Sequence, residues 1–227
     1  MVIYGFYHIC LINDWSEVVN EQINKLIDSG LYEKSDAIYI GALGSSEEVK
    51  NLKDITQEYP KFIVEYTSPN VEEYELPTIN MVHQKSKQED FYCYYIHAKG
   101  VSITEKNMEW YHRSTDFIHL KNCVKDWREY MEYFIIDNHV ESLKIIEDFD
   151  CCGVNLTYSP SPHFSGNFWW SKSSHLKNLK NTINRDRWTA EMWVCSHPKT
   201  KAYGLHENRK AGYRERLSPT YKTISVK

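Results

Sequence analysis

The pattern of hydrophobic and polar positions changes period repeatedly along the first half of this chain. Short apolar runs rich in β-branched and aromatic residues predict four buried strands, at residues 2–11, 37–42, 61–66 and 91–96. Apolar residues at helical spacing lie between the strands, at residues 15–29, from 47 to about 59, and 77–88. Gly30 ends the first helix. This alternation predicts an α/β fold with a mostly parallel central sheet flanked by helices.

The second half predicts more helix than strand. Helical segments are expected at residues 108–122, 125–134 and 138–148, shortly after Ser171, and from Arg187 to Val194. Two further strands are expected at residues 151–155 and 166–171. No Pro/Gly/Ser-rich linker divides the 227 residues, so a single domain, 1–227, is expected.

Composition narrows the function classes. Hydrophobic residues make up 41% and charged residues 26% of the chain, which is typical of a folded globular protein. The net charge of −4, with both signs interspersed, argues against a nucleic-acid partner. The six cysteines have no zinc or redox spacing and fit reduced, buried thiols. No apolar run is long enough to span a membrane and no signal peptide is recognisable, so a soluble, cytoplasmic protein or catalytic piece is expected.

The sequence His-Phe-Ser-Gly-Asn-Phe-Trp-Trp at residues 163–170 combines side chains that suit a sugar. Ser165 and Asn167 offer hydrogen-bond donors and acceptors to hydroxyl groups, and an indole can lie against a pyranose. Gly166 permits a close approach of the backbone. A buried aromatic strand with a polar entry is the other interpretation of the same residues.

Two more segments carry candidate chemistry. The strand at 91–96 leads into His97-Ala98-Lys99-Gly100, where a positive charge and a permissive turn can hold a phosphate. The alternative is a turn whose lysine points into water. Glu191 lies between Trp188 and Trp193 on a predicted helix and can abstract a proton as a general base, or it is an ordinary solvated glutamate.

Together these segments resemble a family. The chain resembles small nucleotide-sugar-dependent glycosyltransferase domains of the GT-A type, which are Rossmann-related and known from bacterial polysaccharide clusters and large DNA viruses. The resemblance is carried by the Tyr-His of the first strand, Tyr-Ile-His-Ala-Lys-Gly-Val at 95–101, the motif at 163–170 and Ala-Glu-Met-Trp at 190–193. The resemblance covers roughly residues 1–206. It implies a nucleotide-binding half at about 1–105 and a sugar and acceptor half at about 106–227.

Residue roles follow from this resemblance. Nucleotide or diphosphate contacts are implied for Tyr7, His8, His97, Lys99 and Gly100, and sugar or acceptor contacts for His163, Ser165, Gly166, Asn167 and Trp169. Glu191 matches the position of the catalytic base of inverting enzymes. The expected reaction is transfer of a hexose from a nucleotide-diphosphate sugar, most simply a UDP-sugar, to a hydroxyl of a growing glycan.

One departure from the family concerns metal. GT-A enzymes commonly hold a divalent cation, Mn or Mg, with Asp-X-Asp at the strand end where this chain has His97-Ala98-Lys99. Asp148, Asp150 and His206 are the candidate ligands elsewhere, and Lys99 can instead neutralise the diphosphate directly. Metal dependence is therefore left open.

Two other functions fit the same residues. In a nucleotidyltransferase or phosphosugar-processing enzyme, His97 and Lys99 would act on a transferring phosphoryl group. In a non-catalytic, lectin-like glycan-binding module, the tryptophan-rich segment would act without Lys99 or Glu191.

Overall fold

A computed structural model describes residues 1–108, 116–181, 187–208, 210 and 212–223. Its central feature is a seven-stranded sheet in the order β3-β2-β1-β4-β8-β5-β9. The strands, in that order, are β3 (Phe62–Ser68), β2 (Ala37–Leu43), β1 (Ile3–Cys10), β4 (Tyr92–His97), β8 (Trp169–Lys172), β5 (Cys151–Gly153) and β9 (Ala202–Gly204). The expected α/β architecture with a mostly parallel sheet is confirmed.

Strand β8 is the exception to the parallel arrangement. Strands β1 to β4 run parallel, and β9 runs parallel to β5, but β8 is antiparallel to both of its neighbours, β4 and β5. A second, two-stranded antiparallel sheet pairs β6 (Leu156–Thr157) with β7 (His163–Phe164). The chain between β7 and β8 must therefore turn at the edge where β4 ends.

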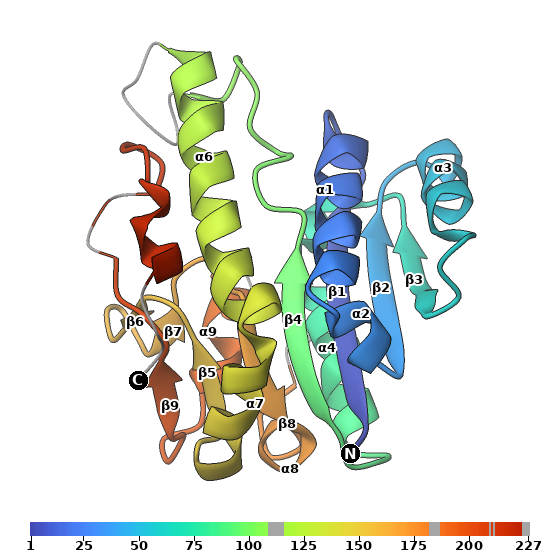
Figure 1. Ribbon diagram of the computed structural model, residues 1–227. Coiled ribbons are helices and arrows are strands. Elements are labelled where there is room, and N and C mark those ends of the chain that lie inside the picture. Colours follow the sequence, from blue (N-terminus) through green and yellow to red (C-terminus); the bar gives the residue numbers. More distant parts are fainter. Residues whose placement is uncertain (109–115, 182–186, 209, 211, 224–227) are drawn as a thin grey trace.

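Helices cover both faces of the sheet (Figure 1). In front lie α1 (Trp15–Asp28), α2 (Leu31–Lys34), α6 (Phe117–Glu132) and α7 (His139–Asp148). The helices α4 (Leu76–Ser86), α8 (Ser173–Leu176) and α9 (Arg187–Met192) belong to the other side, and α3 (Ser46–Thr56) follows β2 near the β3 edge. Short helical turns occur at 71–73, 133–137, 193–195 and 219–223.

The alternation of side chains along β1 divides the core between these two layers. Tyr7 and Ile9 pack with α1 and α6, whereas Phe6 packs with α4 and α9. Apolar residues on the two faces of β1 therefore belong to two separate hydrophobic clusters.

The long helix α6 corrects the prediction of two helices at 108–122 and 125–134. Residues 109–115 lie outside the described part, and the remainder forms one uninterrupted helix, Phe117–Glu132. Asp116 caps it by accepting a hydrogen bond from the backbone nitrogen of His119. Residues 117–132 contain no glycine or proline, so nothing local interrupts the helix. In the described part of the chain, no helix combines the length and apolar character needed to cross a membrane.

Candidate active site

A cleft of about 520 Å³ lies at the carboxyl edge of the parallel strands. The segments that line it are far apart in the sequence, and the lining residues are Glu75, His97, Lys99, Trp127, His163, Ser165, Gly166, Asn167, Trp188, Glu191 and Tyr213. Candidates for phosphate contact, for sugar contact and for the general base all occur among them. The fold therefore brings together three groups of residues that the sequence identified separately.

The turn between β7 and β8 forms one wall of the cleft. Gly166 and Asn167 both have positive φ angles, of 93° and 57°. A Cβ atom on Gly166 would lie 2.4 Å from the sulfur of Met131. Only glycine satisfies both the backbone angle and the contact with α6, so this position is sterically restricted.

The backbone of Gly166 forms hydrogen bonds with both Glu191 and His97. Its backbone nitrogen donates a hydrogen bond of 2.9 Å to Oε1 of Glu191. Nε2 of His97 donates to the carbonyl oxygen of Gly166, also at 2.9 Å. The Glu191 carboxylate is therefore oriented by backbone on one oxygen, and His97 has a positioning contact in addition to its place on the cleft wall.

Glu75 is a cleft residue that the sequence analysis missed. It occupies the N-cap position of α4 without a side-chain capping bond, and its Oε2 accepts hydrogen bonds from Nδ2 of Asn167 at 2.7 Å and from the hydroxyl of Tyr95 at 2.8 Å. Oδ1 of Asn167 in turn accepts from Nε1 of Trp169 at 2.9 Å. One signal was available: Glu75 belongs to the connection that follows β3, and such connections lie at the ligand-binding edge of a parallel sheet.

Lys99 lies against two aromatic rings on another side of the cleft. Its ammonium nitrogen is 4.3 Å from the ring centroid of Trp127 and 5.7 Å from that of Tyr213. These contacts stabilise the cation while leaving it at the cleft, where it can meet an anion. The sequence did not identify either ring, because Trp127 follows the ordinary spacing of an amphipathic helix and Tyr213 reaches the cleft only through tertiary packing.

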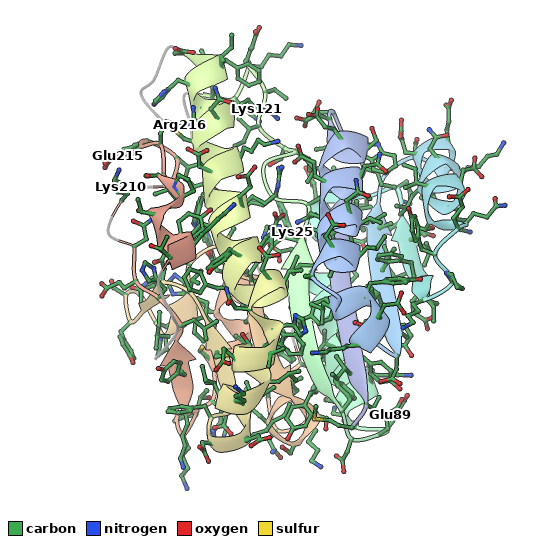
Figure 2. The ribbon with its side chains drawn as sticks, viewed as in Figure 1. Lys25, Glu89, Lys121, Lys210, Glu215 and Arg216 are labelled. Carbon is green, nitrogen blue, oxygen red and sulfur yellow. The ribbon has the colours of Figure 1, made fainter. Side chains whose placement is uncertain are left out.

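The C-terminal segment that carries Tyr213 is attached along α6. The guanidinium of Arg216 forms an ion pair with Asp126 of α6, and the backbone nitrogen of Leu217 donates to the same carboxylate. Figure 2 shows Arg216 and Lys210 beside this helix. Attachment at Asp126, one residue before Trp127, keeps Tyr213 over the cleft.

Four of the predicted contact residues lie outside the cleft. Tyr7 is fully buried and donates its hydroxyl to Oε1 of Gln22, and burial raises its pKa well above the ordinary range. His8 packs against Thr78, and burial lowers its pKa to about 4, so it is neutral near pH 7. Trp169 is fully buried against Tyr95 and offers no open face to a sugar. Gly100 lines a smaller neighbouring cavity of about 190 Å³ between α1 and α6.

The three candidate metal ligands do not form one site. Asp150 precedes β5, at the edge of the sheet opposite the cleft, and its Oδ2 accepts from the backbone nitrogen of Lys201. Asp148 ends α7 on the same side. His206 contacts the hydroxyl of Tyr130 at 2.8 Å, in a separate small cavity. Within the described residues, no set of three or more histidine, cysteine or acidic side chains is arranged to hold a metal.

A larger cavity of about 890 Å³ adjoins the cleft. His163, Trp188 and Glu191 line both spaces. The larger cavity adds amide and hydroxyl side chains, including Asn178 and Ser196, and Trp188 is 58% exposed. A carboxylate on the wall that two cavities share can contact molecules bound in each of them.

Comparison with known proteins identifies one family. A family model described as "Domain of unknown function (DUF8361)" matches residues 6–184, more than half of the chain. No curated protein matches the chain significantly.

Proposed function

The chain belongs to the DUF8361 family, whose description gives no activity, and we propose from the geometry of the cleft that it is a glycosyltransferase. The proposed reaction moves a hexose from a nucleotide-diphosphate sugar, in the simplest case a UDP-sugar, to a hydroxyl group of a glycan. The proposed fold family is GT-A. The sheet is compatible with it, because it is mostly parallel and is flanked by helices on both faces.

One observation carries this proposal. One cleft of about 520 Å³, at the carboxyl edge of the parallel strands, is lined by the general-base candidate Glu191, by the cation of Lys99 and by the polar turn at 165–167. Ligands of α/β sheets bind at that edge. Glycosyl transfer needs these three elements, because it must accept a proton, stabilise an anionic leaving group and hold a sugar ring.

The proposed step is a single inverting displacement. The acceptor oxygen forms a bond to the anomeric carbon while its proton passes to the Glu191 carboxylate. The bond between the anomeric carbon and the diphosphate oxygen breaks, and its electron pair leaves with the nucleoside diphosphate. The ammonium group of Lys99 offsets the negative charge that develops there. The Gly166 hydrogen bond to Oε1 supports this role because it fixes the carboxylate orientation.

The adjoining cavity of about 890 Å³ is the proposed acceptor site. Glu191 borders both spaces, so an acceptor hydroxyl bound there can reach the carboxylate while the donor occupies the cleft. Amide and hydroxyl side chains together with the exposed Trp188 suit a glycan. The lectin-like alternative has less support, because Trp169 and Trp170, which suggested it, are fully buried.

The test of this proposal is a binding screen followed by product analysis. UDP, GDP, CMP and dTDP are added to the purified protein with and without Mn or Mg, and a ligand of the native state raises the melting temperature. The sugar nucleotide of whichever base binds is then incubated with glycan acceptors. We expect stabilisation by one nucleoside diphosphate and a new glycosidic linkage. Stabilisation by none of the nucleotides contradicts the proposal, and a product altered at phosphorus favours the phosphoryl-transfer alternative.

A further inference from the structure

The Glu75 carboxylate is fixed through one of its two oxygens. Tyr95 and Asn167 both donate to Oε2, at 2.8 and 2.7 Å. Within the described part of the chain, no hydrogen bond reaches Oε1. Glu75 is half-buried and lines the cleft. It therefore presents to the cleft an oriented group that accepts hydrogen bonds and carries negative charge.

The support behind Glu75 is rigid. Tyr95 and Trp169 face each other across β4 and β8, with ring centroids 5.1 Å apart and an interplanar angle of 9°. Trp169 donates to Asn167, and both Asn167 and Tyr95 donate to Glu75, which closes a ring of four side chains. Both aromatic residues are fully buried, and Asn167 is 2% exposed. Such a connected network holds the carboxylate in one position without a ligand.

The same turn positions both cleft carboxylates. The backbone of Gly166 binds Glu191, and the side chain of the next residue, Asn167, binds Glu75. A ligand in the cleft therefore lies near two negative charges, one assigned to the proton transfer. The second, Glu75, has no role in that step, and its Oε1 can accept a hydrogen bond from a sugar hydroxyl.

We infer that Glu75 is a specificity-determining residue that binds a hydroxyl of the transferred sugar and selects a neutral hexose over an acidic sugar. This inference rests on the proposed function. A sugar hydroxyl donates a charge-assisted hydrogen bond to Oε1. A uronic acid with a carboxylate in that place would bring like charge against Glu75 and leave Oε1 without a donor.

The experiment is isothermal titration of the wild-type protein and Glu75→Gln with two matched donor pairs. The pairs are UDP-glucose with UDP-glucuronate, and GDP-mannose with GDP-mannuronate, and UDP and GDP are titrated alone. One of the two donor pairs should bind to the wild-type protein. Within that pair, we expect the affinity for the neutral sugar nucleotide to be at least about tenfold higher than the affinity for the acidic one. In Glu75→Gln we expect this ratio to fall toward one, while affinity for the bare diphosphate stays unchanged.

Glu73→Gln is the matched control. Glu73 also accepts hydrogen bonds from two hydroxyl groups, those of Tyr66 and Ser68, but it does not line the cleft. The Glu73→Gln variant should leave the ratio of the two affinities at the wild-type value. A purely structural role of Glu75 would lower the melting temperature without changing the ratio.

The outcomes separate the two proposals. Equal or tighter binding of the acidic sugar by the wild-type protein overturns the role of Glu75, even if Glu75→Gln does not fold. An unchanged ratio in a folded Glu75→Gln also overturns it. Absence of binding by all nucleotides and sugar nucleotides overturns the proposed function and this inference together.

Discussion

The backbone nitrogen of Gly166 lies 2.9 Å from Oε1 of Glu191 and donates a hydrogen bond to it. These residues are 25 positions apart in the chain, and both of them line the cleft. The contact fixes one oxygen of the carboxylate, and among the described residues no hydrogen bond reaches the other, which is available for a proton. It is therefore the relationship on which the proposed chemistry depends most directly.

Replacing Glu191 with Gln should abolish most turnover. The amide oxygen of glutamine can still accept from Gly166, so the wall is preserved, but the group no longer takes a proton. We expect kcat to fall roughly 100-fold to 10,000-fold with little change in donor affinity. Steady-state transfer assays and donor titration measure the two quantities. Wild-type turnover by this variant would exclude Glu191 as the base.

Replacing Gly166 with Ala should destabilise the protein more than the same change at Gly30. Both glycines have positive φ angles, 93° and 75°, and a left-handed alanine costs about 1 kcal/mol. A Cβ atom at Gly30 has no neighbour within 4 Å, whereas at Gly166 it lies 2.4 Å from the Met131 sulfur, which adds overpacking of about 1–3 kcal/mol.

Urea denaturation of both alanine variants measures this difference. Gly30→Ala serves as the control for backbone strain alone. Equal losses in the free energy of unfolding would mean that the Met131 side chain moves aside without cost.

Replacing Lys99 with Met should weaken nucleotide binding without unfolding the protein. Methionine keeps an unbranched side chain against Trp127 and Tyr213 but removes the positive charge. We expect the affinity for a nucleoside diphosphate to fall about tenfold or more, as measured by calorimetry. Lys144→Met is the control, because Lys144 pairs with Glu141 on the exposed surface of α7. Equal affinities of the two variants would remove Lys99 from the diphosphate site.

Glu132 should make stability depend on pH. Its side chain is buried at the end of α6, where it accepts from Gln22 and lies 3.4 Å from Arg128, and burial raises its pKa from 4.5 to about 7. The folded state therefore holds a proton that the unfolded state releases between these values. The stabilisation is fully present below about pH 4.5 and is lost as pH rises through about 7.

Glu132→Gln isolates this effect. Glutamine keeps an acceptor for Gln22 but does not titrate. Between pH 5 and 7.5, the free energy of unfolding of the wild-type protein should decline relative to that of the variant, by on the order of 1–3 kcal/mol. Parallel curves from chemical denaturation across this range would show that Arg128 keeps Glu132 ionised in the folded protein.

Local sequence was sufficient for the elements of the N-terminal half. The expected strands at 2–11 and 37–42 correspond to Ile3–Cys10 and Ala37–Leu43, and the expected helix at 15–29 to Trp15–Asp28. Hydrophobic period and helix-ending residues act over a few positions, so they can be read without knowledge of the fold. The same reasoning failed at 108–134, where part of the predicted pair of helices is the single helix α6.

The chemistry of the cleft was also partly visible. His97, Lys99, the segment 165–167 and Glu191 stood out because polar groups beside strand ends and aromatic residues are unusual in a core. Residue types alone could not show that Trp169 is fully buried whereas Ser165, in the same motif, is half-buried at the cleft. That distinction required the pairing of β8 between β4 and β5, which covers the indole with Tyr95.

The sequence by itself therefore determined which segments form strands and helices and which of them carry reactive side chains. Only the tertiary structure decided which of these side chains meet. Glu75 and Asn167 are 92 residues apart, and Trp127 meets Tyr213 only because the C-terminal segment packs along α6. The physical reason is that periodicity reports whether a side chain is buried, whereas its partner is set by strand order, helix packing and the long-range contacts that these create.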